Sequence, residues 1–266
     1  MVHPYFDTTL ADGRPGVAAL AHRGFARHDG IDSGLENSMA AFGAAVVMGY
    51  RYVETDAHGT KDGVAVALHD ESLDRTTDRT GKVAELSWAE VRRAMIGGVE
   101  PVPKLEDLLE TWPKLRVNID VKHESGIVPI AEAIERTASH DRVCVASFSA
   151  KRRAATLARL SRPVATSAGT SETLKFLAGT RAHSNRLATR AIRDVDALQV
   201  PQRQSGLTFV DASTVKAAHL AGKQVHVWTP NTRTEMEHLL DLGVDGIITD
   251  RADLLRELLI DRNLWA

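Results

Sequence analysis

The chain has 266 residues, of which 43% are apolar and 26% are charged, and its formal net charge is −2. A near-neutral chain offers no basic surface for nucleic acid or for an anionic membrane, so we expect neither as a partner. Its one cysteine, Cys144, cannot form an intramolecular disulfide, which favours a reducing compartment and a cytoplasmic location. No apolar run approaches the roughly 18 residues of a membrane span, and residues 1–14 do not resemble a signal peptide.

Short β-branched or alanine-rich runs alternate with amphipathic stretches along the chain. Eight such runs predict strands at residues 17–21, 52–57, 115–121, 143–148, 164–167, 197–200, 224–228 and 246–249. Helical stretches between them include residues 38–48, 104–112, 127–139, 150–160, 212–221 and 234–242. This alternation predicts a parallel sheet covered by helices, and eight repeats predict that the sheet closes into a (β/α)8 barrel. Because no linker-like segment interrupts the chain, we expect residues 1–266 to form one domain.

Residues 64–68 do not fit the alternation. They follow the second strand after only four residues, Thr60-Lys61-Asp62-Gly63. Such a gap is typical of a hairpin and is too short for a crossover between parallel strands. We therefore expect a returning hairpin arm that brings His69 and Asp70 to the barrel mouth, followed by a small excursion over residues 70–103.

Polar residues stand at the ends of the first two strands, where a (β/α)8 barrel places its active site. His22 and Arg23 follow the first strand, and the period of two in the second strand puts Glu54, Asp56 and His58 on one face. Two carboxylates this close repel one another unless a cation lies between them, which favours a hard divalent metal. We leave His58 outside the ligand set, because oxygen-rich Mg²⁺ or Ca²⁺ sites seldom recruit imidazole.

The third strand repeats this pattern, with Asn118, Asp120 and Lys122 on one face. An Asp–Lys pair can be a structural ion pair; its functional alternative gives Asp120 to the metal and Lys122 to an anion. The hairpin arm supplies His69 beside Asp70, an acid able to fix its tautomer. Paired histidines with carboxylates and cations at one barrel mouth suit phosphate-ester chemistry, in which a metal and cations neutralise the phosphoryl oxygens while imidazoles move protons.

With these residues in place, the sequence resembles the glycerophosphodiester phosphodiesterase family. The matching segments include His22-Arg23-Gly24, Glu36-Asn37-Ser38, Glu54-Thr55-Asp56, His69-Asp70, Asn118-Ile119-Asp120-Val121-Lys122 and Gly246-Ile247-Ile248-Thr249-Asp250. They run in order over nearly the whole chain, densely up to Lys122 and thinly from residue 150 to residue 224.

The resemblance implies a TIM-barrel enzyme that splits deacylated phospholipids into sn-glycerol 3-phosphate and an alcohol, with a bound Mg²⁺ or Ca²⁺. It implies that His22 and His69 are the general acid and base. The metal ligands it implies are Glu54, Asp56 and Asp120, and the substrate or phosphate contacts are Arg23, Lys122, Glu36 and Trp228. Where the family usually has Glu, this chain has Asp120, which is one methylene shorter.

Three other functions remain open from the sequence. The first is a lysophospholipase D or sphingomyelinase D-like activity on acylated lipids, although no segment has the apolar and basic faces of an interfacial helix. The second is a non-catalytic phosphate-metabolite binder on the same fold. The third is an aldolase or isomerase, which would depend on a lone Lys or a Glu base without paired histidines.

A basic stretch over residues 181–193 carries four arginines and no acid: Arg181, Arg186, Arg190 and Arg193. Such a run is usually a solvated helix face or a subunit contact. The alternative is a basic rim that guides an anionic substrate toward the barrel mouth.

Overall fold

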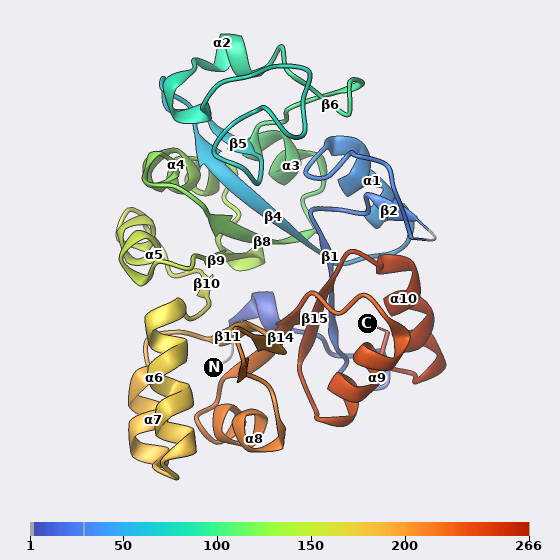
Figure 1. Ribbon diagram of the computed structural model, residues 1–266, viewed down its shortest axis with the longest axis vertical. Helices are drawn as coiled ribbons and strands as arrows, with labels where there is room; N and C mark the ends of the chain where they lie inside the picture. Colours follow the sequence, from blue (N-terminus) through green and yellow to red (C-terminus); the bar gives the residue numbers. More distant parts are fainter. Residues whose placement is uncertain (1–2, 29, 266) are drawn as a thin grey trace.

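The barrel strands of the computed structural model, which describes residues 3–28 and 30–265, follow the predicted runs closely. They are β1 (Ala18–His22), β4 (Tyr52–Gly59), β8 (Arg116–Val121), β9 (Val143–Ala146), β10 (Ala165–Thr166), β11 (Ala197–Pro201), β14 (Gln224–Trp228) and β15 (Gly246–Thr249). Their order in the sheet is β10-β9-β8-β4-β1-β15-β14-β11, and each neighbouring pair is parallel (Figure 1).

The sheet closes between β10 and β11 through a short contact. Ser167 and Ala197 form a parallel bridge. Two backbone hydrogen bonds flank it, from Ala168 N to Ala197 O at 2.9 Å and from Asp196 N to Thr166 O at 2.8 Å. The predicted (β/α)8 barrel is therefore confirmed, and β10 is its shortest strand.

Helices cover the outside of the barrel (Figure 1). The predicted helices form as α1 (Met39–Val47), α3 (Leu105–Thr111), α4 (Ile127–Arg136), α5 (Ala150–Leu157), α8 (Ala212–Leu220) and α9 (Arg233–Asp241). Further helices and turns are η1 (Pro4–Phe6), η2 (Val83–Glu85), α2 (Trp88–Val91), η3 (Glu124–Gly126), η4 (His140–Arg142), α6 (Thr170–Arg181), α7 (Asn185–Ala191) and α10 (Ala252–Asp261). The buried face of α6 includes Thr173 and Gly179, so its apolar pattern is weak.

The hairpin arm is confirmed as β5 (Ala65–Ala67), which pairs antiparallel with β4. A hydrogen bond from Leu68 N to Asp56 O, 3.0 Å long, returns the chain to the barrel mouth. The excursion that follows contains α2 and the hairpin of β6 (Met95–Ile96) and β7 (Glu100–Pro101), and it stands at the top of Figure 1. The excursion has a small apolar core of its own, which includes Leu68, Leu73 and Ile96.

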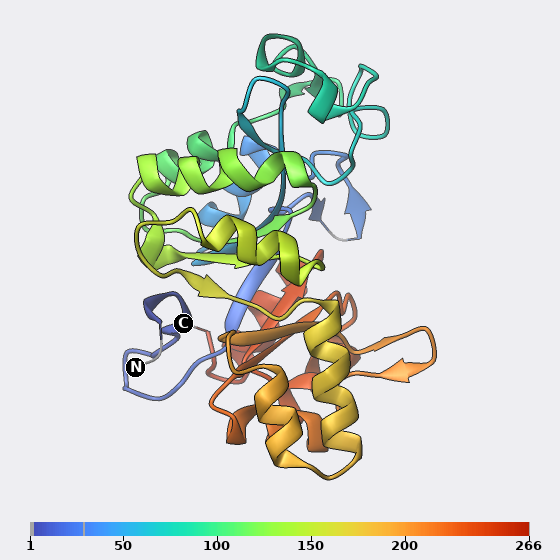
Figure 2. The ribbon, with the colours of Figure 1, turned by 90° about the vertical axis from the view of Figure 1, so that its left-hand side faces the viewer.

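The two ends of the barrel differ. At the start of the strands, η1 inserts Tyr5 and Phe6 into an interior cluster with Leu20, Tyr52 and Cys144. The Tyr52 hydroxyl donates to Tyr5 O at 2.8 Å. At the other end, a small hairpin follows β1 and another follows β11. The first is formed by β2 (Arg27–His28) and β3 (Ile31–Asp32), and the second by β12 (Arg203–Gln204) and β13 (Leu207–Thr208). Figure 2 shows the N-terminal segment and the β12–β13 hairpin on opposite sides. The N-terminal insertion leaves the other end of the interior open for a site.

Within residues 3–28 and 30–265, the helices are all too short or too polar to cross a bilayer.

Candidate active site

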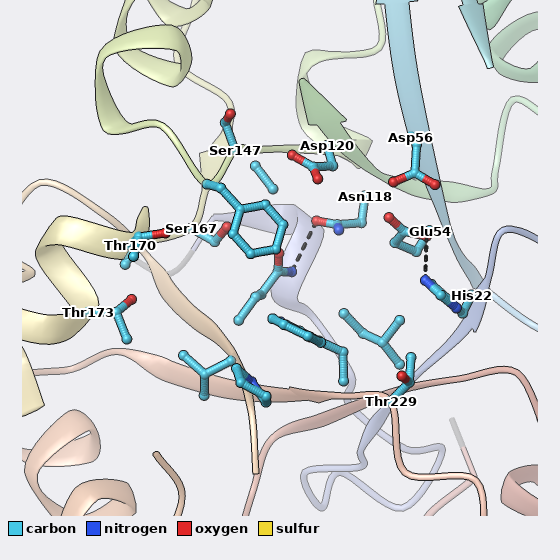
Figure 3. Close-up of a pocket in the computed structure, with 18 of the residues that line it drawn as sticks. His22, Glu54, Asp56, Asn118, Asp120, Ser147, Ser167, Thr170, Thr173 and Thr229 are labelled. Carbon is cyan, nitrogen blue, oxygen red and sulfur yellow. Dashed lines mark hydrogen bonds and ion pairs between the residues drawn. The ribbon is translucent and has the colours of Figure 1, made fainter. Parts of the chain in front are cut away.

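A cavity of about 280 Å³ opens at the carboxyl ends of the barrel strands. Eight of the nine predicted site residues line it: His22, Arg23, Glu54, Asp56, His69, Asp120, Lys122 and Trp228. Figure 3 shows His22, Glu54 and Asp56 together on one side of this cavity. They come from neighbouring strands, β1 and β4, whose register places His22 beside Glu54. Strand periodicity and parallel register thus gather groups that are far apart in sequence.

Each of the two histidines is held by a carboxylate. His22 Nδ1 lies 2.6 Å from Asp250 Oδ1, and His69 Nδ1 lies 2.6 Å from Asp70 Oδ1. Because a carboxylate only accepts, Nδ1 carries the proton in each pair, and Nε2 is left for other groups. Asp250 is itself fixed by the Asn231 side-chain amide, which donates to Asp250 Oδ2 at 2.8 Å.

The contact between His22 and Asp250 also shifts the pKa values of both groups. Burial would lower the pKa of His22, but the hydrogen bond to Asp250 and the charge of Glu54 outweigh it and raise that pKa. Burial would raise the pKa of Asp250, but the same hydrogen bond and the His22 charge lower it to about 2. The pair therefore favours a protonated imidazole beside an ionised carboxylate.

Three buried carboxylates share the cavity with two cations. Lys122 Nζ lies 3.2 Å from Asp56 Oδ1 and 3.3 Å from Asp120 Oδ2, and Arg23 Nε lies 3.1 Å from Asp56 Oδ2. Burial and the Asp56 charge raise the pKa of Glu54 to about 8, and burial raises the pKa of Asp120 to about 6. For Asp56, Lys122 and Arg23 outweigh burial and lower the pKa. Glu54 and Asp120 therefore hold their protons more tightly than free carboxyl groups do when no further cation is bound.

The carboxyl oxygens of Glu54, Asp56 and Asp120 are chemically suited to bind a hard divalent cation. Among the residues that the structure describes, no three His, Cys, Asp or Glu side chains are drawn together as a ready metal cluster, and Lys122 bridges two of the acids instead. However, Asp120 Oδ1 is buried without a hydrogen-bond partner in the described residues. An all-oxygen donor set of three carboxyl groups, which a bound cation would help to ionise, is what Mg²⁺ and Ca²⁺ select.

The loop after β1 is shaped by two residues of the first motif. Arg23 has a φ of +56°, and its backbone N–H donates to Glu54 Oε2 at 3.2 Å. Gly24 has a φ of +80°, and a Cβ at this position would lie 2.7 Å from the Ala41 carbonyl carbon. Only glycine accommodates both the conformation and this approach to α1.

A model of the glycerophosphoryl diester phosphodiesterase family matches residues 22–254 of this chain. The chain belongs to this family. Family membership confirms the resemblance drawn from the motifs, and it favours the phosphodiesterase class over a barrel aldolase or isomerase.

Relatives of this phosphodiesterase family cover nearly the whole chain. Over 250 residues the chain is 46% identical to "Probable glycerophosphodiester phosphodiesterase 2" of Mycobacterium tuberculosis. The aligned region covers 94% of this chain and 93% of that protein. An Oleispira antarctica phosphodiesterase, solved with the product sn-glycerol-3-phosphate, has a TM-score of 0.75 at 22% identity, covering 92% of this chain and 97% of that one. A glycerophosphodiester phosphodiesterase of Agrobacterium tumefaciens has a TM-score of 0.68 at 23% identity, covering 91% and 98%. The two structures confirm the barrel fold.

Glu36, the ninth predicted site residue, is not among the residues that line the cavity, and its contact with substrate stays a prediction. The Glu36 carboxylate instead accepts from Arg23 Nη1 at 3.1 Å and from Arg75 Nη2 at 2.6 Å. Arg75 Nε also donates to Asp70 Oδ2 at 2.6 Å. A carboxylate beside a phosphate would repel it, whereas here Glu36 holds two guanidinium groups in place.

The motifs of this family did not identify every residue that lines the cavity or orients its histidines. Asp250 lay in a quoted motif without a role, yet it follows β15 at a strand end, so the strand-end rule could have found it. The far wall includes Phe148, whose ring meets Trp228 edge-on with centroids 5.8 Å apart. Thr173 lies on α6, a helix that the sequence did not predict.

Two other sequence features lie outside the cavity of this family member. His58 is buried, and its Nε2 lies 3.1 Å from His69 O, behind the catalytic candidate. Among the residues that the structure describes, the lining of the cavity includes none of the four arginines of residues 181–193. Arg181 forms an ion pair with Asp211 at 2.7 Å, at the N-terminus of α8. That arginine therefore has a structural partner.

Proposed function

We propose that this chain hydrolyses glycerophosphodiesters to sn-glycerol 3-phosphate and an alcohol, with one Mg²⁺ or Ca²⁺ as cofactor. The observation that carries the proposal is the pair of imidazoles, each oriented through Nδ1 by a carboxylate at 2.6 Å, that line one cavity with three further carboxylates and two cations. Family membership and the product bound to the Oleispira antarctica relative support it. A cytoplasmic location, expected from the single cysteine, is part of the same proposal.

Glu54, Asp56 and Asp120 would hold the divalent cation. When bound, this cation would neutralise charge on the phosphoryl oxygens. Lys122 and Arg23, which already lie within 3.3 Å of the acids, would bind the same phosphate through N–H donors. Glu36 would position Arg23 for this contact.

His22 and His69 would exchange the protons of the reaction. One Nε2 would take the proton of the attacking hydroxyl, which belongs to water or to the glycerol 2-OH, as that oxygen bonds to phosphorus. The other would give its proton to the alcohol oxygen as the phosphorus–oxygen bond to it breaks. If the attacker is the glycerol 2-OH, water would then open the cyclic phosphate in a second step, with the two imidazoles in exchanged roles, to give sn-glycerol 3-phosphate. Asp250 and Asp70 would stabilise each imidazole while it carries both protons. Each proton transfer is worth about 10²–10⁴-fold in rate.

A coupled assay for released sn-glycerol 3-phosphate tests the proposal. The substrates are several glycerophosphodiesters and one lysophospholipid, first with EDTA and then with Mg²⁺, Ca²⁺ or Mn²⁺ restored. We expect release from at least one glycerophosphodiester, abolished by EDTA and restored by a divalent cation. Cleavage of a lysophospholipid leaves the acyl chain on the glycerol, so its turnover is followed as lysophosphatidic acid and free alcohol. Turnover of the lysophospholipid alone would favour the acylated-lipid activity instead. Binding of the diesters by calorimetry without any turnover would favour the non-catalytic binder.

A further inference from the structure

The charged residues that line the cavity all lie on one side of it, which we call the charged half. All of its charged or titratable lining residues stand at or after β1, β4, β5 and β8. The lining that follows β9, β10, β11 and β14, which we call the uncharged half, contains no Asp, Glu, Lys, Arg or His among the described residues. In Figure 3, Ser167, Thr170 and Thr173 lie across the cavity from Glu54 and His22. A substrate whose phosphate binds the charged half would extend an uncharged portion into this second half.

Two hydroxyls of the uncharged half have no internal partner. Ser167 is 1% exposed and Thr173 is 7% exposed, and both line the cavity. Within residues 3–28 and 30–265, neither side-chain oxygen makes a hydrogen bond, although most buried hydroxyls do. Because they are buried on all sides but the cavity, these hydroxyls are placed to bond a ligand that carries its own donors and acceptors.

A cationic head group would find no counter-charge in this half. The nearest acid in the loop after β10 is Glu172, whose two carboxylate oxygens accept from Arg153 at 2.6 and 2.9 Å. Glu172 also accepts from Gly169 N at 2.8 Å. On the aromatic wall, Lys122 Nζ already lies 5.7 Å from the Phe148 ring centroid. An ammonium group placed against Phe148 would share that ring with Lys122 and would meet no free carboxylate.

We infer that the uncharged half binds the leaving alcohol, and that this alcohol is a neutral polyol of the glycerol or inositol class. This inference rests on the proposed function. The hydroxyls of Ser167 and Thr173 bond the polyol hydroxyls, while its carbon–hydrogen faces lie against Trp228 and Phe148. A choline group offers neither donor nor acceptor to these hydroxyls, and an ethanolamine ammonium offers only donors together with a charge that this half does not neutralise. A site built to bond a polyol hydroxyl therefore discriminates against both groups.

The first test compares kcat/KM for four diesters under one metal condition: glycerophosphoglycerol, glycerophosphoinositol, glycerophosphoethanolamine and glycerophosphocholine. We expect at least one polyol diester to exceed both amino-alcohol diesters by tenfold or more. Equal or greater kcat/KM for the amino-alcohol diesters would overturn the inference and leave the proposed function standing. Absence of turnover for all four, with binding intact, would instead overturn the proposed function.

The second test removes one hydroxyl. Thr173→Val keeps the side-chain shape, and we expect the ratio of kcat/KM for the polyol diester to that for glycerophosphoethanolamine to fall about tenfold. Thr180→Val is the matched control, because Thr180 lies on the same helix, donates to Phe176 O at 3.0 Å and does not line the cavity. An equal fall for all diesters in Thr173→Val would show that this half binds the glycerol common to them, which contradicts the inference.

The third test adds a charge on an exposed hairpin, where folding is least at risk. Gln204 lines the cavity from β12 and is exposed. In Gln204→Glu, we expect kcat/KM for glycerophosphoethanolamine to rise several-fold relative to the polyol diester, because the new carboxylate pairs with the ammonium group. A substrate ratio unchanged in both Gln204→Glu and Thr173→Val would mean that the variable alcohol lies elsewhere, and would overturn the inference.

Discussion

His22 and Asp250 are 228 positions apart in the chain, yet His22 Nδ1 lies 2.6 Å from Asp250 Oδ1. They meet because β1 and β15 are parallel neighbours in the closed sheet, with Ala21 paired to Thr249. The last strand of the barrel thereby orients the first histidine. This contact gives Asp250 a positioning role that the tests below address.

Asp250→Asn should lower kcat on the order of 10²–10⁴-fold, because an amide can bond the wrong tautomer of His22 and does not stabilise its cation. The measurement is steady-state kinetics on the preferred diester, with the melting temperature recorded for both proteins. Asp245→Asn is the matched control, since Asp245 bonds His219 Nε2 at 2.8 Å near the opposite end of the same strand. Similar kcat for Asp250→Asn and the wild type would refute this role.

Arg75→Gln should lower kcat/KM about 10–100-fold, because Arg75 fixes both the Asp70 carboxylate behind His69 and the Glu36 carboxylate behind Arg23. Arg75→Lys should recover only part of the loss, since an ammonium lacks the planar fork that bonds both acids. Arg79→Gln serves as control, because Arg79 donates to Arg93 O in the same excursion. Equal rates in Arg75→Gln and Arg79→Gln would contradict the positioning role.

Asp120→Asn should raise the metal concentration for half-maximal activity about 10–100-fold. A second readout does not need turnover: the rise in melting temperature on adding Mg²⁺ or Ca²⁺ should shrink, because a ligand that binds the folded state stabilises it. In EDTA the variant should melt higher than the wild type, since burial raises the pKa of Asp120 to about 6 and its charge is costly there. A metal-induced shift equal to that of the wild type would remove Asp120 from the ligand set.

Acid should weaken the fold through His226, whose pKa burial lowers to about 4. In the unfolded chain this pKa is about 6.5, so between the two values the unfolded state binds more protons. The free energy of unfolding therefore falls as the pH drops below about 6.5, by about 2 kcal/mol at pH 5. Urea denaturation at pH 7.5 and pH 5 should show a smaller loss for His226→Gln than for the wild type. Parallel losses would disprove this contribution.

Gly24→Ala should destabilise the protein by about 1–3 kcal/mol, from the positive φ and the crowding against Ala41. Gly13→Ala isolates the cost of the positive φ, because Gly13 has a φ of +84° and nothing within 4 Å of the added Cβ. Urea denaturation of the two variants measures the difference. If both lose the same stability, the close approach to α1 has no cost of its own.

Several features of this protein could be predicted from the sequence because they depend on local pattern. The strand period of two placed Glu54 and Asp56 on one face, and the four-residue gap before residue 64 identified the hairpin that carries His69. The eight strands and the barrel followed from alternation alone. Helix α6 was missed because its buried face includes Thr173 and Gly179, which carry no apolar signal.

Only the tertiary structure decided which distant residues meet. Closure of the sheet joins His22 to Asp250, and the excursion brings Arg75 to Glu36, which also accepts from Arg23. The division of the cavity into a charged and an uncharged half arises in the same way, from loops of successive strands meeting around one opening. Sequence patterns report which face a side chain occupies, whereas its partner across the barrel depends on strand order and closure, which no local pattern encodes.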